Sequence, residues 1–323
     1  MSEREVKEIL SAPIIVFAYN RPQNLYQFLE SLKPHRPEVV FFHVDGPKDS
    51  NLDSARVLAT RNIINEIDWI PDIRICYHES NIGLRPAIEC GMKLVFETFD
   101  KVIVCEDDII LGGQFINFLS HNLTKFESDL RIGHISGYNN VPIEFITDPS
   151  KAYRFSIYPE SYAWATWKRS WKYYDPTLTW GAKISWKTLS LITQSRLGGI
   201  VWKNHFHEAY IGRLNSWAFR WVASLWQNNL LCVSPNRNLI LYNGRADGTH
   251  TFRESPWLEI PIEVLPQDTP SEIDRDVTAD KWTQRNVFYG TSKGLLILAL
   301  GNFYRIIKKN QFLEGFLLKK LKK

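Results

Sequence analysis

The chain has 323 residues, of which 44% are hydrophobic and 23% are charged, and its formal net charge is +4. This composition excludes the disordered classes of protein. Because the charge is small and both signs are interspersed along most of the chain, a general nucleic-acid-binding surface is also excluded.

The opening stretch, MSEREVKEIL, carries charges where a signal peptide has its apolar core. No run reaches the roughly 18 apolar residues of a membrane span, so we expect a cytoplasmic protein. The cysteines stand singly in apolar segments, without metal or redox spacing, and are Cys76, Cys90, Cys105 and Cys232. We expect all four to be reduced and to pack as small hydrophobic residues.

Apolar runs of strand length alternate with helical patterns over the first third of the chain. Strands are expected over 12–20, 38–47, 73–78 and 101–105, and helices over 54–67 and 86–98. Another helix is indicated after the first strand, where Leu25, Phe28, Leu29 and Leu32 recur at helical spacing. Strands that are apolar on both faces and alternate with helices predict an α/β fold with a mostly parallel sheet.

Polar clusters follow each of these strands, and ligands of parallel sheets bind at the carboxyl ends of the strands. The clusters are Asn20-Arg21, Asp45-Gly46, residues 81–85 and the acidic triplet Glu106-Asp107-Asp108. We therefore expect the four clusters to converge on one crevice.

The acidic triplet offers hard oxygen ligands, which suit Mg²⁺ or Mn²⁺ and leave coordination sites for phosphates. On an extended backbone, side chains alternate between faces, so Glu106 and Asp108 are expected on one face and Asp107 on the other. An exposed acidic turn, or a helix N-terminus that favours acids, explains the triplet equally well by itself.

Arginines and an aspartate at neighbouring strand ends complete the pattern of a nucleotide-diphosphate site. Arg21 and Arg85 can meet diphosphate oxygens, while Asp45 can accept hydrogen bonds from a base or ribose. Each also has an ordinary structural explanation: a surface ion pair, a helix cap or an Asp-Gly turn. Their common position after successive strands favours the binding site.

The second half is rich in aromatic residues, since nine of the twelve tryptophans lie between Tyr162 and Trp226. These rings can form platforms for sugars or fill a core, and the two interpretations are evenly balanced. After Asn286 the lysines alternate with apolar residues, which predicts a basic amphipathic segment that either lies on anionic lipid or packs on the domain. We predict one compact domain with halves 1–111 and 112–285 and a tail, 286–323.

Four stretches in order, APIIVFAYNRP, FFHVDGP, HESNIGLRPAI and VCEDDIILGGQFINFL, resemble the nucleotide-sugar half of GT-A fold glycosyltransferases. Within that fold they look most like bacterial enzymes distantly similar to the N-acetylglucosaminyltransferase I type. HISGYNN, YPESYAWATWKRSW and SWAFRW extend the similarity, which runs from about Pro13 to Thr251. The resemblance implies a GT-A (Rossmann-like) sheet with an elaborated, aromatic-rich acceptor half.

The implied activity is transfer of a hexose, with inversion, from a nucleotide-sugar to a glycan, expected to be a bacterial surface polysaccharide or a lipid-linked glycan at the membrane. The cofactor is expected to be Mn²⁺ or Mg²⁺. The resemblance places Asp108 on the metal, His250 near the metal or phosphate, Glu106 on the ribose, Asp45 on the base and Arg21 near the phosphates. The full set predicted to bind the donor is Ala18, Asn20, Arg21, Asp45, Arg85, Glu106 and Asp107.

The catalytic base is the weakest part of the pattern, because relatives carry an acid in the tryptophan motif where this chain has Ala218. The candidates are Glu160, Glu208 and Asp247. We favour Glu160, which precedes the aromatic segment, together with Asp107 as a second catalytic residue. A retaining mechanism without a dedicated base stays open.

Two other functions are consistent with the sequence. One is a carbohydrate-binding protein that has lost catalysis, as Ala218 and the tryptophans would allow. The other is a sugar-nucleotide pyrophosphorylase, although AYNRPQN lacks the glycine-rich, lysine-containing loop expected after the first strand.

Overall fold

The computed structural model describes residues 12–48, 50–244 and 260–296. The elements of the first part are β1 (Ile14–Ala18), α2 (Pro22–Leu32), η1 (Lys33–His35), β2 (Val39–Val44), α3 (Asn51–Asn65), β3 (Asp72–Tyr77), α4 (Leu84–Phe96) and β4 (Lys101–Glu106). The strands lie where the sequence predicts them. Helix α3 begins three residues earlier than expected, because the Ser50 side chain accepts a hydrogen bond from the Asp53 backbone amide and caps it.

The second part begins with a short strand and a helix and then alternates strands with clustered helices. Its elements are β5 (Ile109–Leu111), α5 (Phe115–Lys125), β6 (Ile132–Ser136), η2 (Ile143–Phe145), β7 (Tyr153–Ser156), β8 (Ala163–Trp167), α6 (Lys168–Trp171), α7 (Thr179–Lys183), α8 (Trp186–Thr193), α9 (Arg196–Tyr210), α10 (Trp217–Gln227), β9 (Leu231–Pro235), β10 (Ile240–Tyr242) and α11 (Val277–Asn286).

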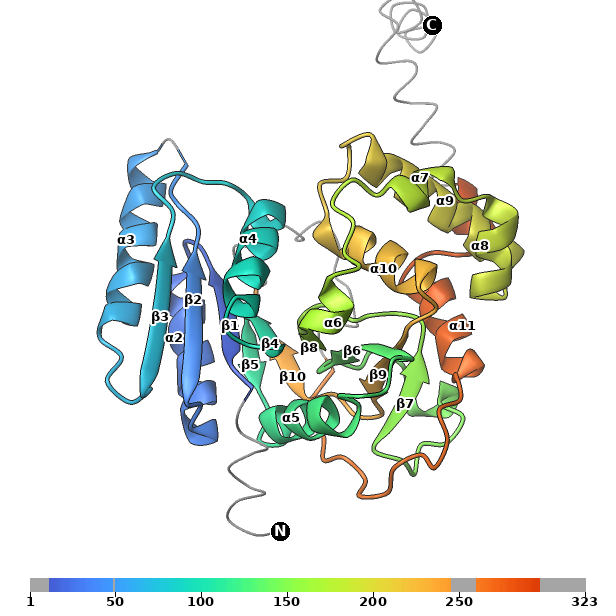
Figure 1. The fold of residues 1–323 in the computed structure, drawn as a ribbon, viewed down its shortest axis with the longest axis horizontal. Helices are drawn as coiled ribbons and strands as arrows, with labels where there is room; N and C mark the ends of the chain where they lie inside the picture. The colour runs from blue at the N-terminus through green and yellow to red at the C-terminus, as the bar shows by residue number, and fades with distance from the viewer. Residues whose placement is uncertain (1–11, 49, 245–259, 297–323) are drawn as a thin grey trace, which may run out of the picture.

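One sheet of eight strands runs through both parts, in the order β3-β2-β1-β4-β8-β6-β9-β7 (Figure 1). The first four strands are mutually parallel, and β6 is parallel to β9, whereas β8 and β7 are antiparallel to their neighbours. In Figure 1, α3 and α4 accompany the parallel strands, and α7 to α10 gather at the other end of the molecule. The predicted α/β fold, a mostly parallel sheet flanked by helices, is confirmed.

Strands β1, β2 and β4 are buried on both faces, as their continuous apolar runs predict, whereas the edge strand β3 is only partly buried. In β1, Ile14, Val16 and Ala18 join one hydrophobic cluster, while Ile15 and Phe17 join another on the opposite face. Apolar side chains of α2 and α5 cover the first face, and those of α4, α9 and α10 cover the second. The sheet is therefore the middle layer of three.

Most of the aromatic-rich segment is core. Six of its nine tryptophans are buried, namely Trp164, Trp167, Trp202, Trp217, Trp221 and Trp226. Five of these six pack in the cluster that α4, α9 and α10 share. The structure thus decides between the two interpretations for these six rings: they fill the interior and do not form a sugar platform.

The antiparallel strand β8 determines what lies beside the acidic triplet. Cys105 of β4 pairs with Ala163, the first residue of β8. Because β8 runs opposite to β4, the residues that precede Ala163 lie at the carboxyl end of β4. Glu160 is thereby brought to the edge of the sheet where Glu106 ends its strand.

Within the part of the chain that the structure describes, no helix combines the length and the apolar character that crossing a bilayer requires. The predicted basic tail is described only up to residue 296, so all its lysines from Lys308 onward lie outside the described residues.

Candidate active site

The acidic triplet sits at a turn. Strand β4 ends at Glu106, and Asp107 and Asp108 form the turn that leads into β5. The backbone amide of Asp107 donates to the Phe17 carbonyl at 3.1 Å, and the Tyr19 amide donates to Asp107 Oδ2, also at 3.1 Å. The extended backbone presumed through Asp108 is therefore wrong, whereas the shared site of Glu106 and Asp108 stays a prediction.

Arg21 lies against the two aspartates. Its Nη1 is 2.6 Å from Asp108 Oδ2 and 3.7 Å from Asp107 Oδ1, so both side chains reach the same guanidinium. Burial lowers the pKa of Arg21, but the charges of Asp107 and Asp108 outweigh it, and the pKa is raised overall. The sequence predicts that Arg21 faces donor phosphates, and in this structure it instead holds the carboxylates expected to bind metal.

One guanidinium does not balance three acids. Burial, and then the charge of Asp108, raises the pKa of Asp107 to about 7. The same two causes, with Asp107 in addition, raise the pKa of Glu106 well above its ordinary value. Burial and mutual repulsion thus disfavour the charged forms of these acids, a divalent cation would stabilise those charged forms, and the oxygen donors suit Mg²⁺ or Mn²⁺. The residues present fit the predicted metal.

Tyrosines connect the triplet to Glu160. The Tyr242 hydroxyl bonds Asp108, and burial followed by the Asp108 charge raises the Tyr242 pKa to about 12. The Tyr162 ring packs against that of Tyr242 with centroids 5.6 Å apart, and against Tyr138 at 5.1 Å. Burial and then Glu160 raise the pKa of Tyr162, so this ring lies close to the acid.

Glu160 is a half-buried acid held by polar contacts. Its Oε1 accepts from the Asn140 side chain at 3.2 Å, and its backbone amide donates to Ser136 Oγ at 3.1 Å. Burial raises the pKa of Glu160 to about 7, against the opposing effect of Arg154. An acid of this pKa can exchange a proton near neutral pH, as the predicted base requires.

His134 fixes the backbone at Glu160. The fully buried His134 ring stacks on Trp164, and its Nδ1 accepts from Trp221 Nε1 at 3.1 Å. Nδ1 is therefore unprotonated, and Nε2–H donates to the Glu160 carbonyl at 3.2 Å. Burial lowers the His134 pKa to about 3, so the ring stays neutral. The sequence analysis missed this residue, although it stands in the HISGYNN motif.

Asp45 organises the loop that follows β3. Its Oδ1 accepts from the amides of Gly46 and Ile82, each at 2.8 Å. Its Oδ2 accepts from the Gly83 amide and the Asn81 side chain, each at 2.9 Å. Because a carboxylate has about four acceptor positions, these protein donors fill it. The contact of Asp45 with a base stays a prediction, and in this structure the residue fixes a loop.

Two glycines make that loop geometry accessible. A Cβ on Gly46 would lie 2.4 Å from the Ser80 carbonyl carbon, so only glycine allows the chains to approach so closely. Gly83 has φ of 82°, which favours glycine, and it precedes the first turn of α4.

The end of β1 is anchored by an acid that the sequence analysis did not single out. Asp53 accepts from the Tyr19 hydroxyl and from the Asn20 side chain, both at 2.5 Å. Asn20 is thus occupied within the protein, and the Ala18 carbonyl accepts from the Asp45 amide at 3.0 Å. The Ser50-x-x-Asp53 spacing of a capping box was the available signal.

Arg85 is placed with a different group of residues. Its Nη1 is 3.8 Å from Glu89, four residues on in α4, and Glu89 also accepts from the Tyr174 hydroxyl at 2.8 Å. The structure therefore gives Arg85 and Arg21 different carboxylate partners. The predicted phosphate contact of Arg85 stays a prediction.

The other candidates for the base lie elsewhere or outside the described residues. Glu208 pairs with Arg213 at 3.1 Å on α9. Ala218, on α10, is packed against the core. His250 and Asp247 lie outside the described residues, so the metal contact predicted for His250 stays a prediction.

Two cysteines depart from expectation. Cys105 and Cys232 are buried thiols, as predicted, but Cys76 is only half-buried and Cys90 is exposed. These two lie beside His43 and His78, and ligand atoms of His43, His78 and Cys90 are all within 4.8 Å of one another. The sequence analysis missed this cluster because its members are far apart in the chain.

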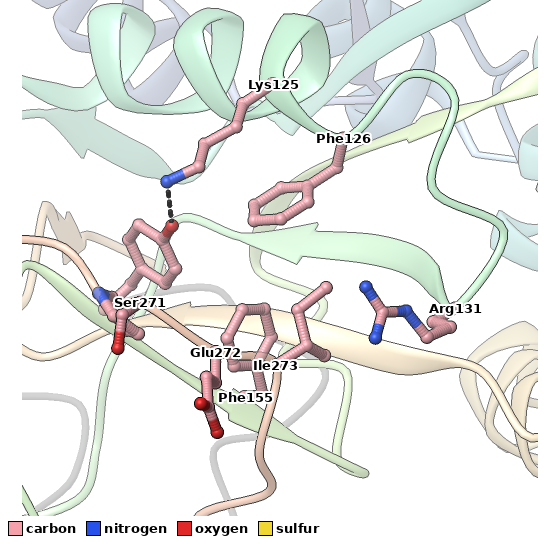
Figure 2. A pocket seen from close by; sticks show the side chains of 9 residues that line it. Lys125, Phe126, Arg131, Phe155, Ser271, Glu272 and Ile273 are labelled. Carbon is pink, nitrogen blue, oxygen red and sulfur yellow. Dashed lines mark hydrogen bonds between the residues drawn. The ribbon is translucent and has the colours of Figure 1, made fainter.

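An open cavity of about 490 Å³ lies beside β7, the last strand in the order of the sheet. It is bordered by the end of α5, by Arg131 just before β6, by β7 and by residues 270–273 (Figure 2). Figure 2 shows Phe126, Phe155 and Ile273 between the cationic side chains of Lys125 and Arg131, and Lys125 donates to the Tyr153 hydroxyl at 2.7 Å. None of the predicted site residues lines this cavity.

No protein-family model matches the chain. Among solved structures, it is similar to a mannosyltransferase, PcManGT from Pyrobaculum calidifontis in complex with GDP-Man and Mn²⁺, with TM-score 0.37 and 15% identity over 67% of this chain and 74% of that one. It is also similar to HddC from Yersinia pseudotuberculosis complexed with GMP-PN, with TM-score 0.32 and 12% identity over 49% and 77% of the two chains.

A third similar structure is a Bacillus anthracis protein described as a glucose-1-phosphate thymidylyltransferase, in complex with a sucrose. Its TM-score is 0.30 and its identity 10%, over 50% of this chain and 74% of that one. At identities and TM-scores this low, the similarities carry no argument about activity. The fold assignment rests on the strand order and the pairing described above.

Proposed function

We propose that this protein is a metal-dependent glycosyltransferase of the GT-A type, which moves a hexose from a nucleotide-sugar to a glycan hydroxyl. One observation carries the proposal: the acidic triplet and Glu160 lie at the same edge of the sheet, linked by Tyr242 and Tyr162. A group that binds the leaving diphosphate and a group that takes the acceptor proton must be neighbours in such an enzyme.

Asp108 is the residue that would hold the cation, with Asp107 or Glu106 beside it. When bound, Mn²⁺ or Mg²⁺ supplies positive charge that stabilises the leaving diphosphate. Arg21 Nη1 lies 2.6 Å from Asp108 Oδ2, so the guanidinium and a cation would compete for the same carboxylate oxygen. A cation bound to Asp108 would release the guanidinium of Arg21 from that carboxylate. Arg21, three residues after the end of β1, could then contact a phosphate of the donor.

Glu160 is the proposed base. Its pKa of about 7 places it near the operating pH of most enzymes, and Asn140 and His134 hold it in position. Glu208 lacks these features because it is paired with Arg213. A dedicated carboxylate base supports an inverting mechanism.

The acceptor remains a bacterial surface polysaccharide or lipid-linked glycan in this proposal, and the basic tail would bring the enzyme to the membrane. The burial of six tryptophans removes the main support for an inactive carbohydrate-binding protein. Among the residues that the structure describes, none favours the pyrophosphorylase.

The test is hydrolysis of a panel of nucleotide-sugars by the purified protein, with Mn²⁺ or with a chelator. Asp108→Asn is expected to reduce the metal-dependent hydrolysis by about 100-fold or more, because it removes the carboxylate closest to the proposed metal. Asp68→Asn is the control, since Asp68 is an exposed acid remote from the triplet. Retention of metal-dependent hydrolysis by Asp108→Asn, at the level of that control, would contradict the proposal.

A further inference from the structure

A second group of side chains that could bind a metal ion lies next to the loop that Asp45 holds. His43 is in β2, His78 directly follows β3, and Cys90 is in α4. We propose that His43, His78 and Cys90 form a binding site for zinc or a similar soft divalent ion, separate from the oxygen ligands at Asp108. This site does not depend on the proposed transferase activity.

The two imidazoles already have the spacing of ligands to one ion. Their Nε2 atoms are 3.1 Å apart. In a tetrahedral zinc site, with Zn–N bonds of about 2.0–2.1 Å, two ligand nitrogens are about 3.3 Å apart. All three ligand atoms lie within 4.8 Å of one another, and Cys90 is exposed, so a rotation of its side chain can complete the set.

The His43 ring is buried and packs against the His78 ring, with centroids 4.7 Å apart. His43 is 1% exposed. Its Nδ1 is buried and has no hydrogen-bond partner among the described residues. Its Nε2, by contrast, lies 3.1 Å from His78 Nε2, and a bound ion would replace that nitrogen–nitrogen contact with a metal bond to each ring.

The donor atoms select the kind of ion. Thiolate and imidazole ligands favour zinc over magnesium and manganese, which favour oxygen. Cys76 is available as a fourth ligand, because its Sγ is 4.0 Å from His78 Nε2.

A bound ion would tie three elements together at one point. His43 lies two residues before Asp45, and His78 is the residue at which the loop of residues 78–83 begins. The ion would thus link β2, the end of β3 and α4, next to the loop that Asp45 holds. The expected effect is stabilisation of the folded chain by zinc.

The test is titration of the reduced full-length protein with Co²⁺, followed by absorption spectroscopy. A thiolate–cobalt charge-transfer band reports the cysteine ligand, and a carboxylate and histidine site such as that proposed at Asp108 gives no such band. We expect the band in the wild type and its displacement by Zn²⁺. Asp108→Asn should keep it, as should the control His121→Gln, since His121 is an exposed histidine on α5.

Cys90→Ser is expected to lose the band, and His78→Ala to weaken Co²⁺ binding by at least about tenfold. Because Cys90 is exposed, its replacement should leave the fold intact, and thermal unfolding without metal checks this directly. Two results would overturn the site: absence of the band from the wild type, or a band of wild-type intensity in Cys90→Ser. Zn²⁺ should raise the melting temperature of the wild type and of His121→Gln, but not that of Cys90→Ser.

Discussion

Glu160 shows how much a single residue owes to its surroundings. In the sequence it is one of several acids, with no pattern to distinguish it as a base. In the structure, burial raises its pKa to about 7, and Asn140 and the backbone contacts of His134 and Ser136 hold it beside Tyr162. The pKa and the placement both come from groups distant in the chain.

Glu160→Gln is expected to lower kcat by about 10² to 10⁴-fold, the range for loss of a general base. In the wild type, kcat/KM should rise with pH through about 7, as Glu160 loses its proton, and this rise should vanish in the variant. Asp107 also has a pKa of about 7, so it could cause the same rise. If Glu160 is the base, the rise in kcat/KM should persist in Asp107→Asn. A Glu160→Gln enzyme with the wild-type profile would contradict the assignment.

The raised pKa of Glu160 also predicts that Glu160→Gln, which lowers activity, increases stability at high pH. Measuring both properties separates a catalytic defect from a folding defect. The pKa of Glu160 is about 7 in the folded state, against an ordinary value of 4.5. The protonated acid is thus favoured by folding, and its contribution is full below pH 4.5 and is lost as the pH rises through 7. Glu160→Gln should therefore be more stable than the wild type at pH 8, by up to about 3 kcal/mol in urea unfolding, with no such gain at pH 4.

At the scale of elements, the junction between β2 and α4 depends on one carboxylate. Asp45→Asn replaces one carboxylate oxygen, which accepts two hydrogen bonds, with an amide nitrogen, which accepts none. We expect a loss of about 2 to 4 kcal/mol in the free energy of unfolding, measured by urea denaturation. Glu79→Gln, at an exposed acid in the same loop, should change it by no more than about 0.5 kcal/mol. Equal stability of both variants would mean that Asp45 does not hold the loop.

The local elements of the first part could be predicted from the sequence because their signals are local. Apolar runs, helical spacing and Asp-Gly or Gly-containing turns place β1 to β4 and α2 to α4 close to their observed bounds. The direction of β8 has no such signal. Whether a strand pairs parallel or antiparallel depends on the path of the chain through the helices before it, and the position of Glu160 follows from that direction.

At the scale of the whole molecule, the proposed donor should act as a folding ligand. A nucleotide-sugar that binds only the folded chain, at about 100 times its dissociation constant, adds about 2.7 kcal/mol of stability. For a chain of this size the melting temperature should rise by about 4 °C. The rise should require Mn²⁺ or Mg²⁺ and should disappear in Asp108→Asn, when each sample is compared with metal alone.

Screening several nucleotide-sugars in this way identifies the donor at the same time. A carbohydrate-binding protein without catalysis would instead be stabilised by free sugar, with or without metal. A shift of equal size in the presence of a chelator would contradict the metal-dependent donor site.

The sequence by itself determined the α/β class, the order of the first strands and helices, and the polar clusters at the strand ends, because all of these are written in short-range spacing. Only the tertiary structure decided that Arg21 lies on Asp108, that Asp45 is filled by backbone amides, that most of the tryptophans are core, and that His43, His78 and Cys90 meet. Those outcomes depend on which distant segments pack together, and on the burial and charge that each group then experiences, neither of which a linear pattern contains.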